Sequence, residues 1–312
     1  MVIADLLDGG RTVRAIAEEI GRSPSTVSRE IRRNRDECGR YRPHYAEQAA
    51  RARACRARGR RVAGDVELRD AVVELLGKRW SPEQVAHELR IRFAGQRLRC
   101  LCTETIYQAI YDPAVDVTRP GRRRRRRRRV LGDQRRGRLT AMSMIDERPV
   151  AVEDRVQAGH WEGDLIMGPG NRSAIGTLVE RRSRFLILLH LPGGVSTAES
   201  VRQAISTALT VLPDGLRRTL TWDQGKELAL HRQITATTGT AVFFCDAHSP
   251  WQRGSNENTN GLLRDYFPKG SDLSVFDAEE LQRVAVEMND RPRKTLGWSR
   301  PADLFGTALA AA

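Results

Sequence analysis

Three acidic side chains, far apart in the chain, have the residue types of a metal-dependent phosphodiester-transfer site. Asp164 lies inside an apolar predicted strand, where aspartate is disfavoured, and Asp223 ends another apolar strand. Glu257 starts a late predicted helix within the polar run SNENTN. Mg²⁺ prefers such oxygen ligands, and two ions about 3.5–4 Å apart activate an attacking oxygen and stabilise the leaving 3′ oxygen. Each acid alone is typical of a cap or turn, so the hypothesis requires that all three converge.

Further polar residues surround Glu257. Arg264 follows it by seven residues, or two helical turns, and therefore shares its face. Arg264 either places a cation against DNA phosphate or is an ordinary exposed arginine. For His248, Gln252 and Asn260 three roles are open: they orient metal-bound water, they contact DNA, or their local hydrogen bonds shape the loop before the helix.

Other residues flank the acids without a chemical role. Trp161, Trp222 and Trp251 are predicted to pack the core around the acids rather than to stack on bases. Glu162 alternates with the inward side of its strand, which predicts a surface position.

The elements that must position the acids alternate between strands and helices from residue 150 onward. Apolar runs and turn residues predict three antiparallel strands, then a helix, a strand, a helix, a strand and closing helices. The clearest segments are strands at 159–168, 174–180, 184–191, 218–223 and 241–245, and helices at 196–212 and 277–290, with residues 250–266 leading into a further helix. This order is typical of the ribonuclease-H-like fold.

The excess of positive over negative side chains is confined to the first half of the chain. Residues 1–150 hold 35 Lys and Arg against 20 Asp and Glu, whereas residues 151–312 hold 18 against 19. Such a split predicts a polyanion-binding half joined to a near-neutral half. Phosphate contact without sequence discrimination, rather than a solubilising linker, is expected of the run Arg122, Arg123, Arg124, Arg125, Arg126, Arg127, Arg128 and Arg129.

The segment RTVRAIAEEIGRSPSTVSREIRRN predicts a helix-turn-helix. Gly21 can end the first helix in a left-handed conformation, and Ser23 with Pro24 can begin the second. A plain helical hairpin with a solvated basic face is the alternative. As a DNA reader, the second helix would present to base edges and phosphates Ser25, Thr26, Ser28, Arg29, Arg32 and Arg33.

A second helical zone follows, with Ser81 and Pro82 beginning one helix and Thr103 another. It is either a second helix-turn-helix or a helical spacer. The sequence thus predicts an α+β multidomain chain: a helix-turn-helix domain (1–60), a second helical domain (65–115), an arginine-rich linker (116–150) and a ribonuclease-H-like core (151–312).

Several classes of protein are disfavoured. The five cysteines are odd in number and include no CxxC, which argues against a disulfide framework and a structural zinc site. No apolar run approaches the length of a membrane span, and MVIADLLDGG lacks the features of a signal peptide. We therefore expect a cytoplasmic, DNA-associated protein with no membrane partner.

Four strings carry a resemblance to a known family. GHWEGDLI, TWDQGKE, DAHSPWQRGSNENTNGLLRDYFPKGSDLS and SPSTVSREIRRN resemble the bacterial IS-thirty family of DDE transposases, over about residues 3–306. The resemblance places the family triad on Asp164, Asp223 and Glu257, with 33 residues between the last two, and its downstream basic residue on Arg264. Members usually carry more residues before this helix-turn-helix, so either the first helix is trimmed or the start codon is misassigned.

The resemblance implies an integrase-type core with two Mg²⁺ ions, for which Mn²⁺ would substitute. It also implies recognition of terminal inverted repeats, 3′-end cleavage, strand transfer into target double-stranded DNA, and a homo-oligomer on DNA at the bacterial nucleoid. Two alternatives remain open: a DNA-binding regulator with an inactive core, and a nuclease without strand-transfer activity.

Overall fold

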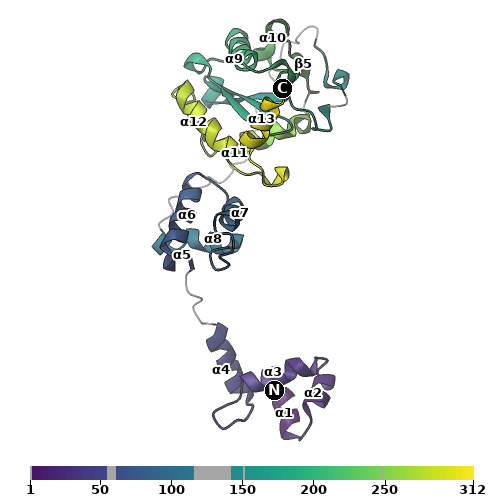
Figure 1. The fold of residues 1–312 in the computed structure, drawn as a ribbon, viewed down its shortest axis with the longest axis vertical. Helices are drawn as coiled ribbons and strands as arrows, with labels where there is room; N and C mark the ends of the chain where they lie inside the picture. Colours follow the sequence, from purple (N-terminus) through teal and green to yellow (C-terminus); the bar gives the residue numbers. More distant parts are fainter. Residues whose placement is uncertain (1, 55–60, 116–141, 150–151, 248) are drawn as a thin grey trace. The chain divides into compact units, whose positions relative to one another are not determined.

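The computed structural model describes residues 2–54, 61–115, 142–149, 152–247 and 249–312 (Figure 1). Its contacts divide the chain into two units, Met1–Val66 and Glu67–Ala312. The arginines from Arg122 to Arg129 lie outside the described residues.

The first unit is helical. Its helices are α1 (Val2–Asp8), α2 (Val13–Glu19), α3 (Pro24–Arg33), α4 (Pro43–Ala54) and α5 (Arg61–Gly64). Ser23 Oγ accepts a hydrogen bond from Thr26 N (3.3 Å), and Gly21 has a φ of +64°. Because Ile16 and Val27 are buried between α2 and α3, the two helices pack closely. The predicted helix, tight turn and helix are confirmed.

The second unit begins with three further helices, α6 (Val66–Gly77), α7 (Pro82–Arg92) and α8 (Thr103–Ile110). Ser81 begins α7 as predicted: its side chain and that of Gln84 cap each other's backbone N–H. Val85, Leu89 and Ile106 are fully buried, which packs α8 against α7.

A five-stranded mixed sheet forms the centre of the second unit. Its strands are β1 (His160–Met167), β2 (Ala174–Glu180), β3 (Leu186–Leu189), β4 (Thr219–Trp222) and β5 (Ala241–Phe244). They lie in the order β3-β2-β1-β4-β5, with β1, β2 and β3 antiparallel and β4 and β5 parallel to β1. The three antiparallel strands and the order of strands and helices along the chain are as predicted.

Helices cover both faces of the sheet. One face carries α9 (Ala198–Thr210) and α10 (His231–Thr238), and the other carries α11 (Gly254–Leu263) and α12 (Ala278–Asn289); α13 (Pro301–Ala310) ends the chain. Side chains alternate between two apolar cores because successive strand residues point to opposite faces. On β2, Leu178 belongs to the α9 core and Val179 to the α11 core.

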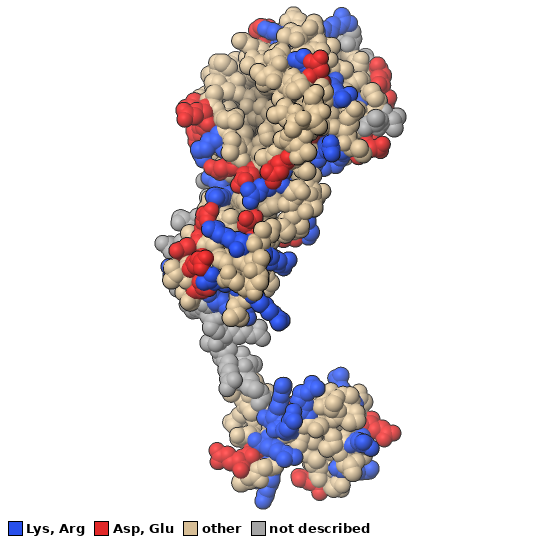
Figure 2. Space-filling view, viewed as in Figure 1, with Lys and Arg blue, Asp and Glu red and all other residues tan. Residues whose placement is uncertain are grey.

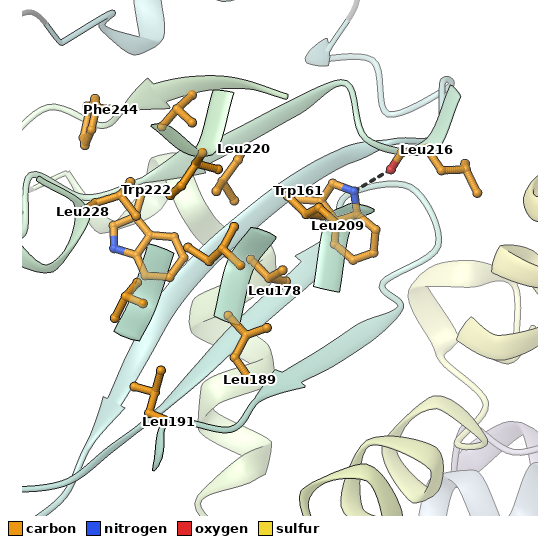
Figure 3. Packing of buried hydrophobic residues seen from close by; sticks show 14 of the residues in the cluster. Trp161, Leu178, Leu189, Leu191, Leu209, Leu216, Leu220, Trp222, Leu228 and Phe244 are labelled. Atoms are coloured by element: carbon orange, nitrogen blue, oxygen red, sulfur yellow. Dashed lines mark hydrogen bonds between the residues drawn. The ribbon is translucent and has the colours of Figure 1, made fainter. Parts of the chain in front are cut away.

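Two of the three predicted core tryptophans are confirmed. Trp161 and Trp222 are fully buried in the α9 core (Figure 3), where the Trp161 indole N–H donates to Leu216 O at 2.8 Å. The prediction for Trp251 is wrong, because 72% of this residue is exposed in the short turn before α11. Within the described part of the chain, no helix is long and apolar enough to cross a bilayer.

Candidate active site

The strand register brings Asp164 and Asp223 together. Parallel strands β1 and β4 pair His160 with Thr219 and, two residues on, Glu162 with Thr221. The same offset continued by two residues sets Asp164 beside Asp223 at the end of β4. Both side chains then leave the sheet on the face that α11 covers, because Ile166, two residues after Asp164, belongs to the α11 core.

A single arginine joins the two carboxylates. Arg253, the last residue of the turn before α11, lies 3.4 Å from Asp164 Oδ1 and 3.5 Å from Asp223 Oδ2. Its Nη1 also donates to Gly163 O at 2.6 Å. Sequence reasoning missed this residue, although it precedes Glu257 by one helical turn.

The electrostatics of the pair depend on Arg253. Burial raises the pKa of Asp164; Arg253 opposes this rise and Asp223 adds to it. Burial lowers the pKa of Arg253, but the carboxylates of Asp164 and Asp223 outweigh burial and raise it. The site therefore concentrates negative charge that requires a cation.

Glu257 lies on the same side of α11 as the residues that reach the aspartates. Arg253, Glu257 and Asn260 are spaced by four and three residues, and the first and last of them contact Asp164. Glu257 itself is exposed and lines a neighbouring cleft. Among the described residues, no three His, Cys, Asp or Glu side chains come close enough together to hold a metal ion. The structure therefore joins two of the three acids, and the role of Glu257 stays a prediction.

The other polar candidates have separate surroundings. Asn260 Nδ2 donates to Asp164 Oδ2 at 3.0 Å, which orients that carboxylate. Arg264 is half-buried, and Asp164 lies near enough to oppose the lowering of the Arg264 pKa by burial. Gln252 instead bonds with the neighbouring Asp246, and His248 lies outside the described residues.

The position of Glu162 differs from the prediction. It was predicted at the surface, yet it is fully buried. Its carboxylate lies 3.0 Å from Arg181 Nη1 and accepts a hydrogen bond from Asn256 N at 3.0 Å, while Asn256 Nδ2 donates to Glu162 O at 2.9 Å. Because both faces of the sheet are covered, the alternate position on β1 also faces a helix. Glu162 thereby fastens the start of α11 to the strand that carries Asp164.

A further carboxylate lies close to the pair. Glu227, in the turn Lys226–Leu228 that follows β4, accepts a hydrogen bond from Trp222 Nε1 at 3.2 Å. Burial raises its pKa, and the charges of Asp223 and Asp164 raise it further. The string TWDQGKE placed Glu227 four residues after Asp223, but that spacing carried no interpretation.

The donor set suits a hard divalent cation. Asp164 and Asp223 supply adjacent carboxylate oxygens, which favour Mg²⁺ or Mn²⁺ over metals that prefer thiolate ligands. The guanidinium of Arg253 spans these oxygens and shows that the pair attracts positive charge, but its single charge leaves the two carboxylates only partly compensated. The residues present therefore fit such an ion, with Glu257 on the adjoining helix.

The predicted DNA-contacting side chains lie on one helix of the first unit. All six, Ser25, Thr26, Ser28, Arg29, Arg32 and Arg33, belong to α3 and are exposed. Figure 2 shows Lys and Arg side chains gathered on a face of this unit. The buried residues Val27 and Ile31 fix the opposite side of α3 against α2.

Family models match both parts of the chain. Residues 1–34 match the helix-turn-helix domain, and residues 155–250 match the integrase core domain. Among solved structures, the catalytic core domain of BIV integrase is 18% identical with a TM-score of 0.39, covering 49% of this chain and 97% of that one.

Curated relatives match over nearly the whole length. The chain is 44% identical to the transposase for insertion sequence element IS1086 of Cupriavidus metallidurans, covering 96% of this chain and 90% of the relative. It is 41% identical to transposase InsI for insertion sequence element IS30C of Escherichia coli, covering 97% and 81%. It is 35% identical to the transposase for insertion sequence element IS4351 of Bacteroides fragilis, covering 94% and 89%.

Proposed function

The chain belongs to the IS30 (IS-thirty) family of insertion-sequence transposases, polynucleotidyl transferases with an integrase core, and we propose how its residues carry out transposition. Two Mg²⁺ ions, or Mn²⁺ in their place, would be held by Asp164, Asp223 and Glu257. When bound, such ions activate the attacking oxygen and stabilise the leaving 3′ oxygen of a phosphodiester.

Water first attacks the phosphorus at the element end and displaces a 3′ oxygen, which leaves as a 3′-hydroxyl. That hydroxyl then attacks a target phosphodiester and displaces its 3′ oxygen, so one phosphodiester forms as another breaks. No covalent bond to the protein is needed. Arg253 holds the aspartate carboxylates side by side, and Asn260 orients Asp164. Arg264 would place its cation against DNA phosphate beside Asp164.

DNA recognition is assigned to the basic half. The exposed polar side chains of α3 would read the inverted repeats, helices α7 and α8 would add contacts, and the arginines from Arg122 to Arg129 would bind backbone phosphate. Because transposition joins two ends, we expect a homo-oligomer on DNA. The bacterial nucleoid would be its place of action.

The observation that carries the proposal is the joining of Asp164 and Asp223 beneath the helix that bears Glu257. Its test is Mg²⁺-dependent nicking and strand transfer with an oligonucleotide that contains the element end. Asp164→Asn is expected to bind the end normally and lose cleavage, whereas Asp214→Asn, at an exposed carboxylate of the same unit, keeps both.

Retained cleavage by Asp164→Asn would remove Asp164 from the mechanism. Wild-type protein that binds ends but neither nicks nor joins them would be a regulator. Nicking without strand transfer would identify a nuclease.

A further inference from the structure

A cleft of about 1010 Å³ within the second unit is lined by Glu257, one of the three predicted acids. One wall is α11, with Glu257 and Gly261, and the other comes from the helical segment that holds α7 and α8. Three contacts fix that segment against the core: Gln84 Nε2 donates to Pro292 O at 2.8 Å, Lys294 pairs with Glu83 at 2.6 Å, and the rings of His87 and Trp298 stack 4.3 Å apart. The cleft is thus bounded on both sides by docked elements.

The helical wall presents two aromatic rings. Tyr107 and Tyr111 are 44% and 81% exposed, and both line the cleft. They are four residues apart at the end of α8, so they lie on one face. Exposed aromatic rings in a basic groove are the surfaces on which proteins stack unpaired bases.

Cations line the same cleft. Arg79, Arg291 and Arg293 all contribute to its lining, and none of them takes part in an ion pair described in this structure. Arg291 is only 2% exposed, and the Nε atoms of Arg291 and Arg293 have no hydrogen-bond partner in the described structure. Burial and the neighbouring Arg291 lower the pKa of Arg293 to about 10. An anion in the cleft would relieve this accumulation of positive charge.

The dimensions favour a single strand. Pockets of about 300–1,000 Å³ enclose ligands of drug size, which corresponds to a few nucleotides rather than the width of a duplex. Because Glu257 and Gly261 form one wall, a strand in the cleft contacts the helix that bears Glu257.

We propose that this cleft binds a few unpaired nucleotides of the DNA strand that is presented to the acid pair. The bases stack on Tyr107 and Tyr111, and the phosphates contact Arg79 and Arg293, while the buried Arg291 adds its positive charge from beneath. This inference rests on the proposed function, since it assigns part of the DNA substrate to a site lined by Glu257.

The test measures binding of the full-length protein in EDTA, so that no cleavage takes place. The probes are fluorescein-labelled 30-base-pair duplexes of one arbitrary sequence, either blunt or with a four-thymidine extension on the 3′ or the 5′ strand. The ratio of blunt to extended Kd cancels the duplex binding of the N-terminal unit. We expect wild-type protein to bind one extended duplex at least tenfold more tightly than the blunt one.

Three variants make the result specific. Tyr107→Ala/Tyr111→Ala should lose most of this gain, whereas Tyr107→Phe/Tyr111→Phe should keep it because the rings remain. Tyr45→Ala removes an exposed tyrosine of α4 in the other unit and should keep the gain. Thermal unfolding confirms that each variant is folded.

The proposal is overturned if neither extension tightens wild-type binding, if the double alanine variant keeps the gain, or if Tyr45→Ala loses it equally. These outcomes do not depend on the acids. Cleavage by Asp164→Asn would contradict the proposed chemistry, but the ratio of blunt to extended Kd is measured without metal and would still test the cleft.

Discussion

Arg253 combines two tasks at the acid pair. Its guanidinium spans Asp164 and Asp223, and its donation to Gly163 O ties it to β1. Without a cation, two adjacent carboxylates repel each other and one of them tends to take up a proton. Arg253 is therefore a positioning residue that opposes the rise of the Asp164 pKa caused by burial and holds the two aspartates close together before a divalent ion binds.

Replacing this arginine should expose the competition between arginine and metal. Arg253→Gln is expected to destabilise the metal-free protein by about 1–2 kcal/mol, because the partly exposed carboxylates lose their counter-charge. The rise in Tm on adding MgCl₂ should then exceed that of wild type. Thermal unfolding with and without Mg²⁺ checks this, with Arg182→Gln at an exposed position as control. An equal or smaller Mg²⁺ effect in Arg253→Gln would contradict the assigned role.

His160 makes the core sensitive to acid. Burial, together with Arg218, Arg181 and Arg148, lowers the pKa of His160 to about 4, and its Nδ1 lies 2.9 Å from Thr219 Oγ1. Histidine in the unfolded chain has a pKa near 6.5, so below that pH the unfolded state takes up a proton that the folded state does not. Stability should be unaffected above about pH 6.5 and decrease as the pH falls toward 4.

The comparison is made by urea unfolding at pH 7.5 and 5.0. Between pH 7.5 and 5.0, the free energy of unfolding of His160→Gln should fall by about 2 kcal/mol less than that of wild type. His190→Gln, at a half-buried histidine of the same unit, should behave like wild type. Equal losses in wild type and His160→Gln would show that His160 does not set the acid sensitivity.

At the scale of elements, the acids depend on how closely β1 approaches Trp222. A Cβ at Gly163 would lie 2.1 Å from the Trp222 ring, which is itself fully buried. These two residues immediately precede Asp164 and Asp223. The packing of one face of the sheet therefore sets the spacing of the carboxylates on the other.

Gly163→Ala should force Trp222 aside. We expect a loss of about 2–3 kcal/mol in the free energy of unfolding, the usual cost of overpacking a core, and a fall in Mg²⁺-dependent nicking. Gly306→Ala is the control, since its added methyl meets open space in α13 and should stabilise by about 0.5–1 kcal/mol. Denaturant unfolding measures the free energy of unfolding of both variants. An unchanged value for Gly163→Ala would refute this account of the carboxylate spacing.

Local pattern predicted the elements well because each is encoded by neighbouring residues. This local pattern predicted the cap at Ser23, the left-handed conformation of Gly21 and the apolar strands. Glu162 was misplaced because alternation marks a surface only when one face of a sheet is bare. Arg253 was missed because its partners lie 89 and 30 residues earlier in the chain, and local periodicity carries no information on such pairs.

At the scale of the whole molecule, charge separates DNA capture from chemistry. Residues 1–150 carry 35 Lys and Arg against 20 Asp and Glu, whereas the remainder is almost balanced at 18 against 19. The acid site thus lies in the half that adds little to long-range attraction of DNA. Capture should therefore depend on salt through the first half and on divalent ions hardly at all.

The salt dependence of binding tests this division. Each lost phosphate contact reduces the slope of log K against log salt by about 0.9, so Arg29→Gln/Arg32→Gln on α3 should lower it by about 2. Arg232→Gln, an exposed arginine of α10, should leave the slope unchanged, as should Asp164→Asn. Anisotropy titrations with end-containing duplex between 50 and about 200 mM salt measure it. The α3 variant should keep the Mg²⁺-induced rise in Tm, because the acids are intact. An unchanged salt slope in that variant would mean that Arg29 and Arg32 do not contact phosphate.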